Sequence, residues 1–299
     1  MTFVDSVAAY NRHIGIDAPR LGGLDVRSFG ENMAHVQLDQ PPFRHNLFAI
    51  AWLVRGTNRQ VMGEPLASNV FFNAPYQIVT WEIAADWDGY YAIFDEGFAR
   101  EYLHVPAPTR EWPFFADATS RPLDLPAADM PWFSLTFERL HAVGLSTVAD
   151  ALIEPAVAGA FLHALLDLAA VHYDAAPASR GDLQEHDHYA QLVAKARAFA
   201  LEALAAGRGR PAPGDLAEAL AVSPGHLNAV VREITGQTTT ELLSRLVLAE
   251  GQRLLRHTDL QIQEISDRLG YSAPTHFNAF FRRATGASAT AWRRGASGA

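Results

Sequence analysis

The sequence predicts an α+β protein of two domains: an N-terminal β-barrel accompanied by helices and an all-α C-terminal domain. A chain of 299 residues is long enough for two domains that each bury a core. Short apolar segments separated by turns fill the first hundred residues, whereas apolar residues recur at helical spacing later in the chain. The charge also changes sign: residues 1–182 hold 11 arginines and no lysine against 22 acidic residues, net −11, and residues 183–299 carry net +2.

In the N-terminal domain, residues 1–132, we expect strands from about Asp25 to Phe94. Short segments rich in apolar and β-branched residues predict these strands: His35–Leu38, His45–Val54, Asn69–Phe72, Gln77–Trp81 and Tyr90–Phe94. Short strands at this spacing are typical of a small barrel or jelly roll.

Helices are predicted after the strands, at Asp95–Leu103, Ser134–Val143 and Pro155–Tyr173. The last one has a wide apolar stripe that must be buried, either against the barrel or against a second subunit. We assign residues 133–174 to a helical region and residues 175–188, with alanine, proline and glycine, to a linker.

The C-terminal domain, residues 189–299, contains one helix–turn–helix pattern twice, at 215–236 and 264–286. Each second segment has an apolar stripe at i, i+3, i+4 and i+7 and closes on Thr-Gly, where glycine can end a helix. The two stripes are Leu227, Val230, Val231, Ile234 and Phe277, Phe280, Phe281, Ala284. A long helix, about Thr240–His257, joins the copies. In a helix-turn-helix the second helix enters the DNA major groove.

These segments resemble the AraC/XylS family of bacterial transcriptional regulators over roughly residues 189–294. The matching stretches are Ser223–Leu227, Ile234–Gly236, Arg253–Asp259, Glu264–Ser272, His276–Arg283 and Trp292–Arg293. The resemblance implies a cytoplasmic, homodimeric regulator, such as an activator, that binds double-stranded DNA and works with RNA polymerase. It also implies that residues 133–174 are the helical dimerisation region. A looser resemblance to the cupin-like sensor domain of such regulators rests on Phe43–His45, Trp52–Gly56 and Phe72–Gln77. It implies that a small-molecule effector binds in the barrel.

Residues on the exposed side of the two second helices are the candidates for DNA contact: Gly225, His226, Asn228, Ala229 and Arg232, and Thr275, His276, Asn278, Ala279, Arg282 and Arg283. Ala229 and Ala279 stand where many family members carry arginine. Base reading is therefore predicted to rest on the asparagines, which suit adenine, with the histidines as secondary readers. The arginines are expected at phosphates.

Aromatic and basic residues of the barrel are the candidates for an effector site: Arg44, His45, Trp52, Phe72, Tyr76, Trp81 and Tyr91. The alternative is that the aromatic residues only fill the barrel. Of the metal-binding set of cupin enzymes only His45 is present, and the chain has no cysteine. We therefore expect no metal, no cofactor and no catalytic residues.

Two other functions stay open: a ligand-free DNA-binding protein whose barrel only dimerises, and a barrel enzyme fused to a DNA-binding module. The N-terminus has no basic region followed by an apolar stretch, and no apolar run approaches the length of a membrane span. A cytoplasmic protein without a membrane partner is expected.

Overall fold

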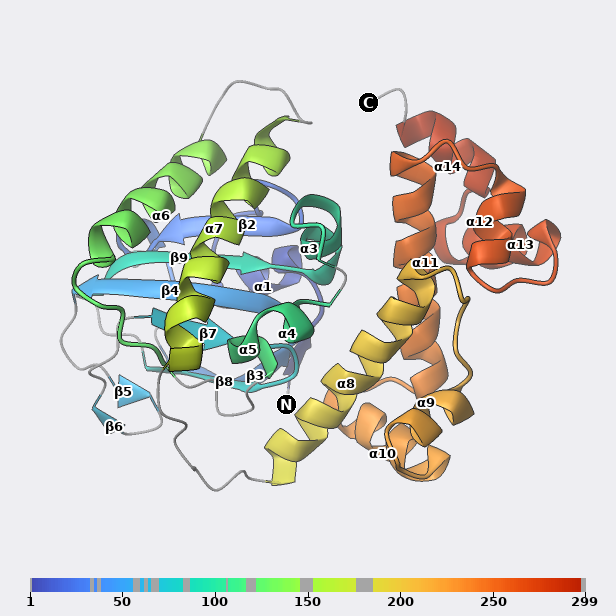
Figure 1. The fold of residues 1–299 in the computed structure, drawn as a ribbon, viewed down its shortest axis with the longest axis horizontal. Coiled ribbons are helices and arrows are strands. Elements are labelled where there is room, and N and C mark those ends of the chain that lie inside the picture. Colours follow the sequence, from blue (N-terminus) through green and yellow to red (C-terminus); the bar gives the residue numbers. More distant parts are fainter. Residues whose placement is uncertain are drawn as a thin grey trace. The chain divides into compact units, whose positions relative to one another are not determined.

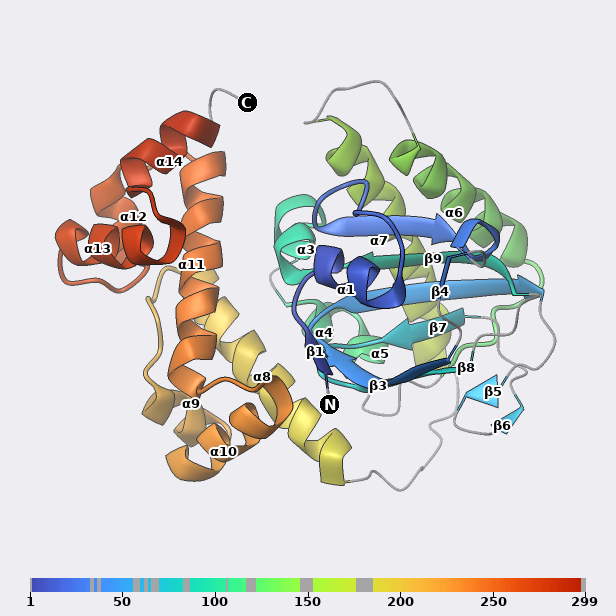
Figure 2. The ribbon, with the colours of Figure 1, turned by 180° about the vertical axis from the view of Figure 1, so that it is seen from behind.

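The computed structural model describes residues 2–32, 35–36, 39–55, 60–61, 64–65, 70–82, 87–105, 107–116, 122–145, 153–175 and 185–296. Its contacts divide the chain into an N-terminal unit, residues 1–191, and a C-terminal unit, residues 192–299. The first contains all the strands that the structure describes, and the second is helical (Figures 1 and 2).

Two sheets form the centre of the N-terminal unit. The first has the order β1 (Thr2–Val4), β3 (Asp39–His45), β8 (Ile78–Glu82), and the second has the order β2 (Leu24–Ser28), β9 (Asp88–Phe94), β4 (Phe48–Arg55), β7 (Val70–Asn73). All neighbours are antiparallel except β1 and β3, and β5 (Gln60–Val61) pairs only with β6 (Glu64–Pro65). The described strands form these sheets without closing into a barrel, so the cupin-like barrel stays a prediction.

One expected strand was wrong at its start, and another begins three residues later than expected. His35 and Val36 do not begin a strand; their N–H groups both donate to the carbonyl of Asn32, at the end of α2 (Phe29–Asn32), and form a turn. The segment His45–Val54 is divided between β3 and β4, because the N–H of Leu47 donates to Nδ1 of His45 (3.1 Å) and turns the chain there.

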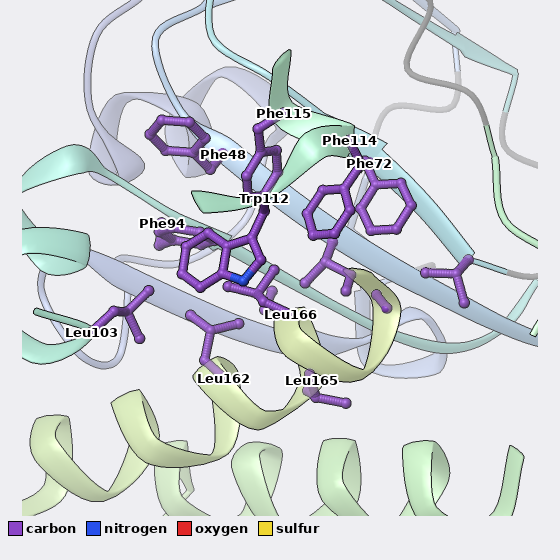
Figure 3. Packing of buried hydrophobic residues seen from close by; sticks show 14 of the residues in the cluster. Phe48, Phe72, Phe94, Leu103, Trp112, Phe114, Phe115, Leu162, Leu165 and Leu166 are labelled. Carbon is purple, nitrogen blue, oxygen red and sulfur yellow. The ribbon is translucent and has the colours of Figure 1, made fainter. Parts of the chain in front are cut away.

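One face of the four-stranded sheet carries large apolar side chains that pack against helices (Figure 3). Those helices are α5 (Pro113–Ala116), α6 (Met130–Gly144) and α7 (Ile153–Ala175). Phe72 stacks on Phe114 with ring centroids 4.0 Å apart, and Trp52 meets Phe133 edge-on at 5.8 Å. The predicted helical region therefore completes the main core of the N-terminal unit.

Helix α7 corrects the expectation that no segment could span a membrane. Its residues Glu154–Tyr173, with mean hydropathy 1.4, are long and apolar enough to do so by length and composition. A core helix passes the same test. Here Leu162, Leu165 and Leu166 are fully buried, and Leu162 and Leu166 point toward the aromatic residues of the sheet core (Figure 3).

The opposite face of this sheet meets α1 (Val7–Ile14) through a buried polar network. Nδ2 of Asn11 donates to Oδ2 of Asp25 (2.6 Å), and Nε of Arg27 donates to the same oxygen (2.9 Å). A charged carboxylate inside a protein requires such partners. The network therefore connects α1 to β2. The remaining helices of this unit are α3 (Glu96–Tyr102) and α4 (Pro108–Glu111).

Seven helices make up the described part of the C-terminal unit: α8 (Glu185–Ala205), α9 (Pro213–Ala219), α10 (Pro224–Thr235), α11 (Thr239–His257), α12 (Ile262–Arg268), α13 (Pro274–Thr285) and α14 (Ala289–Ala296). Since α8 starts at Glu185, the last four residues of the expected linker are helical. The division between the units falls within α8, after Gln191.

Candidate nucleic-acid interface

The pairs α9–α10 and α12–α13 are two helix-turn-helix units with matching local geometry. Both second helices have 12 residues, with proline in the first turn, and both end at a glycine in the left-handed region, Gly236 (φ 72°) and Gly286 (φ 79°). The turns also use left-handed residues, Ala221 (φ 54°) and Gly270 (φ 83°). Ser223 caps α10 by accepting from the N–H of His226, whereas Ala273 has no side chain that could cap α13.

The apolar stripes hold both second helices against the rest of the unit. In α10, Leu227, Val230, Val231 and Ile234 are all buried. In α13, Phe277 and Phe281 are fully buried, and Phe281 packs edge-on against Trp292 of α14. Ala284, which the stripe predicted to be buried, is exposed, since Phe281 and Trp292 already close this end of the core.

Most residues predicted for DNA contact lie on the free face of these helices. The exposed ones are Gly225, His226, Ala229 and Arg232 in α10, and Thr275, His276, Ala279, Arg282 and Arg283 in α13. Nδ1 of His276 hydrogen-bonds with Oγ of Ser272 (3.1 Å), which orients the imidazole at the start of α13. Each recognition helix thus offers one imidazole in its first turn; near its end α10 offers one guanidinium group and α13 offers two.

The two asparagines differ from the other predicted residues. Both are half-buried, and each uses its side-chain oxygen on the next helix. Oδ1 of Asn228 accepts from the N–H of Thr239 (3.1 Å), and Oδ1 of Asn278 accepts from the N–H of Ala289 (3.3 Å). Thr239 and Ala289 are the first residues of α11 and α14, whose N–H groups have no partner inside the helix. Each asparagine therefore fastens a recognition helix to the helix that follows.

Residue type alone did not predict this role, although the sequence contains a signal for it. Asn228 and Asn278 each stand 11 residues before the first residue of the next helix. They also occupy equivalent places in the two copies. A base-reading asparagine needs Oδ1 as well as Nδ2 to pair with adenine, so this hydrogen bond competes with base reading.

Comparison with known proteins gives a match in this part of the chain. Residues 216–295 match the model of a helix-turn-helix domain. Over 68 residues the chain is 37% identical to the HTH-type transcriptional activators RhaR of Cronobacter sakazakii and RhaS of Salmonella arizonae. The C-terminal domain is a helix-turn-helix domain of the AraC/XylS type. These matches cover 23% of the chain and 24% of each relative, so the chain spans about a quarter of the length of these relatives.

Solved structures that are similar to the AraC/XylS-type domain include the C-terminal domain of AraT, a response regulator from Geobacillus stearothermophilus. It is 29% identical, with a TM-score of 0.32, and the match covers 34% of this chain and 84% of that one. Another is the DNA-binding domain of AdpA in complex with a target DNA. It is 26% identical, with a TM-score of 0.31 and coverage of 36% and 90%.

Outside the AraC/XylS-type domain, the predicted effector residues fall into two places. Trp52 and Phe72 lie in the core between the four-stranded sheet and the helices. Arg44, His45, Tyr76 and Tyr91 lie apart from that core: a guanidinium N–H of Arg44 donates to the carbonyl of Tyr76, and the hydroxyl of Tyr91 accepts from Nδ2 of Asn32 (2.5 Å). The side chain of Trp81 lies outside the described residues.

His45 is the most unusual residue of this second group. It is fully buried, and burial lowers the pKa of its imidazole to about 4, so the ring is neutral near pH 7. Its Nδ1 accepts from Leu47, and its Nε2 is buried without a hydrogen-bond partner in the described part of the chain. Tyr10 of α1 approaches the ring edge-on, with centroids 5.8 Å apart. A buried polar atom without a partner is costly.

A cavity of about 740 Å³ lies elsewhere, between α3 and α7. Its lining includes Tyr102, His104, Gly159 and His163, and none of the predicted effector residues.

Among the residues that the structure describes, no group of three or more histidine, aspartate or glutamate side chains is placed to hold a metal ion. The expectation of a metal-free protein stays a prediction.

Proposed function

We propose that this protein is a sequence-specific transcription regulator whose C-terminal domain binds double-stranded DNA. The observation that carries the proposal is the duplication: two helix-turn-helix units in one AraC/XylS-type domain, each with an exposed recognition-helix face. A single helix–turn–helix shape also serves as a packing unit, whereas two copies with equivalent free faces suit two major grooves. The curated relatives that match this domain are themselves transcriptional activators.

In this proposal, α10 and α13 enter two successive major grooves on one side of the duplex, about 34–36 Å apart. The imidazoles of His226 and His276, in the first turns, face base edges together with Thr275. Arg232, Arg282 and Arg283 contact phosphates. Asn228 and Asn278 support their helices and contribute less to base reading than the sequence suggests.

The test is DNA binding by the full chain and by Arg282→Ala and Arg283→Ala. Both side chains are exposed, so their removal should leave the fold intact. Each variant should bind all sequences more weakly, and the slope of log K against log salt should fall by about one, because one phosphate contact is lost. Lys195→Ala, an exposed charge on α8, is the matched control. A loss limited to one base position would show instead that the arginine reads a base.

We further infer that a small-molecule effector binds in the N-terminal unit, near Arg44, His45, Tyr76 and Tyr91. The unpartnered Nε2 of His45 supports this: since Nδ1 accepts from Leu47, Nε2 carries the proton and offers a buried donor to an acceptor group of a ligand. Binding there would shift the population of arrangements between the two units and so the affinity for DNA. The regulator would act as a cytoplasmic homodimer together with RNA polymerase.

A thermal-shift screen of small molecules tests the effector. A ligand at 100 times its Kd should raise the stability of the N-terminal unit by about 2.7 kcal/mol, which a shift in melting temperature reveals. His45→Phe, which removes both ring nitrogens, should abolish the shift for a ligand that bonds to Nε2. A screen without any ligand would favour the ligand-free alternative, and turnover of a hit would favour the enzyme.

A further inference from the structure

The segment between α8 and α9 is basic, and backbone hydrogen bonds hold it at both of its arginines. It reads Gly207-Arg208-Gly209-Arg210-Pro211. The N–H of Arg208 donates to the carbonyl of Ala203 (2.9 Å) and closes α8, and the N–H of Arg210 donates to the carbonyl of Leu269 (3.2 Å) at the end of α12. The segment is thus hydrogen-bonded to the second helix-turn-helix. The chain then continues into α9, which begins the first helix-turn-helix.

Two glycines make this close approach possible. A Cβ on Gly209 would lie 2.7 Å from Cα of Gly270, and a Cβ on Gly270 would lie 3.0 Å from Cα of Gly209. Both residues also have positive φ, 78° and 83°. Only glycine adopts a positive φ and tolerates so close a backbone contact at low cost. Gly209 and Gly270 therefore hold the segment against the turn between α12 and α13.

The arginines of this segment are directed away from that contact. Gly209 is buried, whereas Arg208 and Arg210 on either side of it are exposed. A Cβ on Gly207 would meet the side chain of Arg268, also exposed, at 3.6 Å. Neither arginine of the segment makes an ion pair in the part of the chain that the structure describes.

The segment is also close to the recognition helix α13. Burial raises the pKa of Tyr271, and the positive charges of Arg210 and Arg283 both oppose this shift. Two guanidinium groups therefore lie near one phenol, one from the segment and one from α13. In both ribbon views the chain after α8 runs past the second helix-turn-helix to α9 of the first (Figures 1 and 2).

Two recognition helices in successive major grooves leave one minor groove between them, on the same side of the duplex. Protein that connects the two units on that side faces this minor groove and its phosphates. The segment is hydrogen-bonded to α8 and to the end of α12, and it presents two exposed arginines, neither of which makes an ion pair with another described residue. A narrow, A·T-rich minor groove has an enhanced negative potential that attracts arginine.

We propose that Gly207–Pro211 is a third DNA-binding element, which places Arg208 and Arg210 in the minor groove between the two major-groove sites. The element selects A·T-rich sequence there, because the amino group of guanine projects into the minor groove and obstructs a side chain. This inference rests on the proposed DNA binding.

The first experiment selects binding sites from a random pool of duplex DNA with the full chain. We expect two motifs about one helical turn apart, with A·T-rich sequence between them. The Arg208→Ala/Arg210→Ala variant should select the same two motifs with an unbiased spacer. No enriched motif with the unaltered protein would overturn the proposed function, whereas two motifs with an unbiased spacer would overturn only this inference.

The second experiment compares three spacers in the selected site: A·T, G·C and inosine·C. Inosine·C has the major-groove edge of G·C but lacks the amino group in the minor groove, so it distinguishes the two grooves. The A·T and inosine·C spacers should bind alike, and the G·C spacer should bind roughly five- to tenfold more weakly. Equal binding of G·C and inosine·C would show that the minor groove is not read.

Two further variants separate charge from fold. Arg208→Ala/Arg210→Ala should bind all three spacers equally, and its melting temperature should match that of the unaltered protein, since both side chains are exposed. Lys195→Ala removes one exposed charge from α8 and should keep the preference among spacers. A double variant that still discriminates against the G·C spacer contradicts the proposal.

Discussion

At the scale of single residues, some polar side chains of the recognition helices are exposed, whereas others hydrogen-bond to backbone N–H groups. Asn228 and Asn278 show the difference most clearly, because their chemistry suits adenine while their oxygens accept from the N–H groups of Thr239 and Ala289. Residue type alone therefore does not identify a base reader. The partner of the side chain does.

The asparagine hydrogen bonds predict a specific pattern of substitution effects. Asn278→Ala should lower the free energy of unfolding of the C-terminal unit by about 1 kcal/mol, the usual contribution of one hydrogen bond. Asn278→Asp keeps an acceptor at Oδ1 and should restore most of it. Urea unfolding measures both. If Asn278 reads adenine instead, Asp would change base preference as much as Ala does, because the donor Nδ2 is lost in both.

His45 predicts a dependence of stability on pH. Its pKa is lowered to about 4 in the folded protein from 6.5, so the unfolded chain binds a proton first as the pH falls. The stabilisation is complete above about pH 6.5 and is lost toward pH 4, with a slope of about 1.4 kcal/mol per pH unit. Unfolding free energies of the unaltered protein and His45→Gln, measured from pH 4 to 7, should differ by this slope.

A second buried group, Asp95, also makes stability depend on pH, so the effect of His45 must be measured as a difference from His45→Gln. Burial raises the pKa of its carboxyl to about 6 from 3.8, so its contribution to stability is present at low pH and is lost as the pH rises through that range. It titrates over the same interval as His45 with the opposite sign. Since Asp95 is present in both proteins, its effect cancels. Equal pH slopes in the two proteins would show that His45 is protonated in the folded state.

At the scale of elements, helical periodicity predicted more than strand patterns did. The segment Thr240–His257 differs from α11 by one residue, because its stripe and caps are local features of the sequence. His35 and Val36 lie in a turn, since alternation over four residues does not exclude a turn after a short helix; the rest of that expected strand lies outside the described residues. Contacts between distant segments, such as the one between Gly209 and Gly270, have no periodic signal and could not be predicted.

The glycines of the second helix-turn-helix allow a matched comparison. Gly270 and Gly286 have similar positive φ, 83° and 79°, but a Cβ on Gly286 would meet nothing within 4 Å. Gly286→Ala should therefore lose only about 1–2 kcal/mol for the left-handed backbone. Gly270→Ala should lose clearly more, because its Cβ also meets Gly209. Urea unfolding measures the difference, and equal losses would show that the segment after α8 moves aside freely.

At the scale of the whole molecule, charge and apolar surface divide between the two halves of the chain. The N-terminal half has net charge −11, which repels phosphates, and its helices expose the large apolar side chains of Trp132, Leu135 and Val171. A contact between Nε2 of His172 and Oδ2 of Asp129 (3.1 Å) brings the end of α7 beside the start of α6. The apolar side chains at these two ends thus lie on neighbouring helices, as a protein interface requires.

This surface predicts how the proposed homodimer is held together. Trp132 and Val171 are each 67% exposed. Losing an aromatic anchor such as Trp132 from an interface costs on the order of 2–4 kcal/mol, and a carboxylate introduced at Val171 would be buried there without a partner. Trp132→Glu and Val171→Glu should each raise the dissociation constant of the dimer by roughly two orders of magnitude. Sedimentation velocity over a range of concentrations measures it. Val54→Glu, on β4 and 44% exposed, is the control and should leave the dimer intact. If the unaltered protein is monomeric, the proposed dimer does not form. If neither substitution changes its dissociation constant, the interface lies elsewhere.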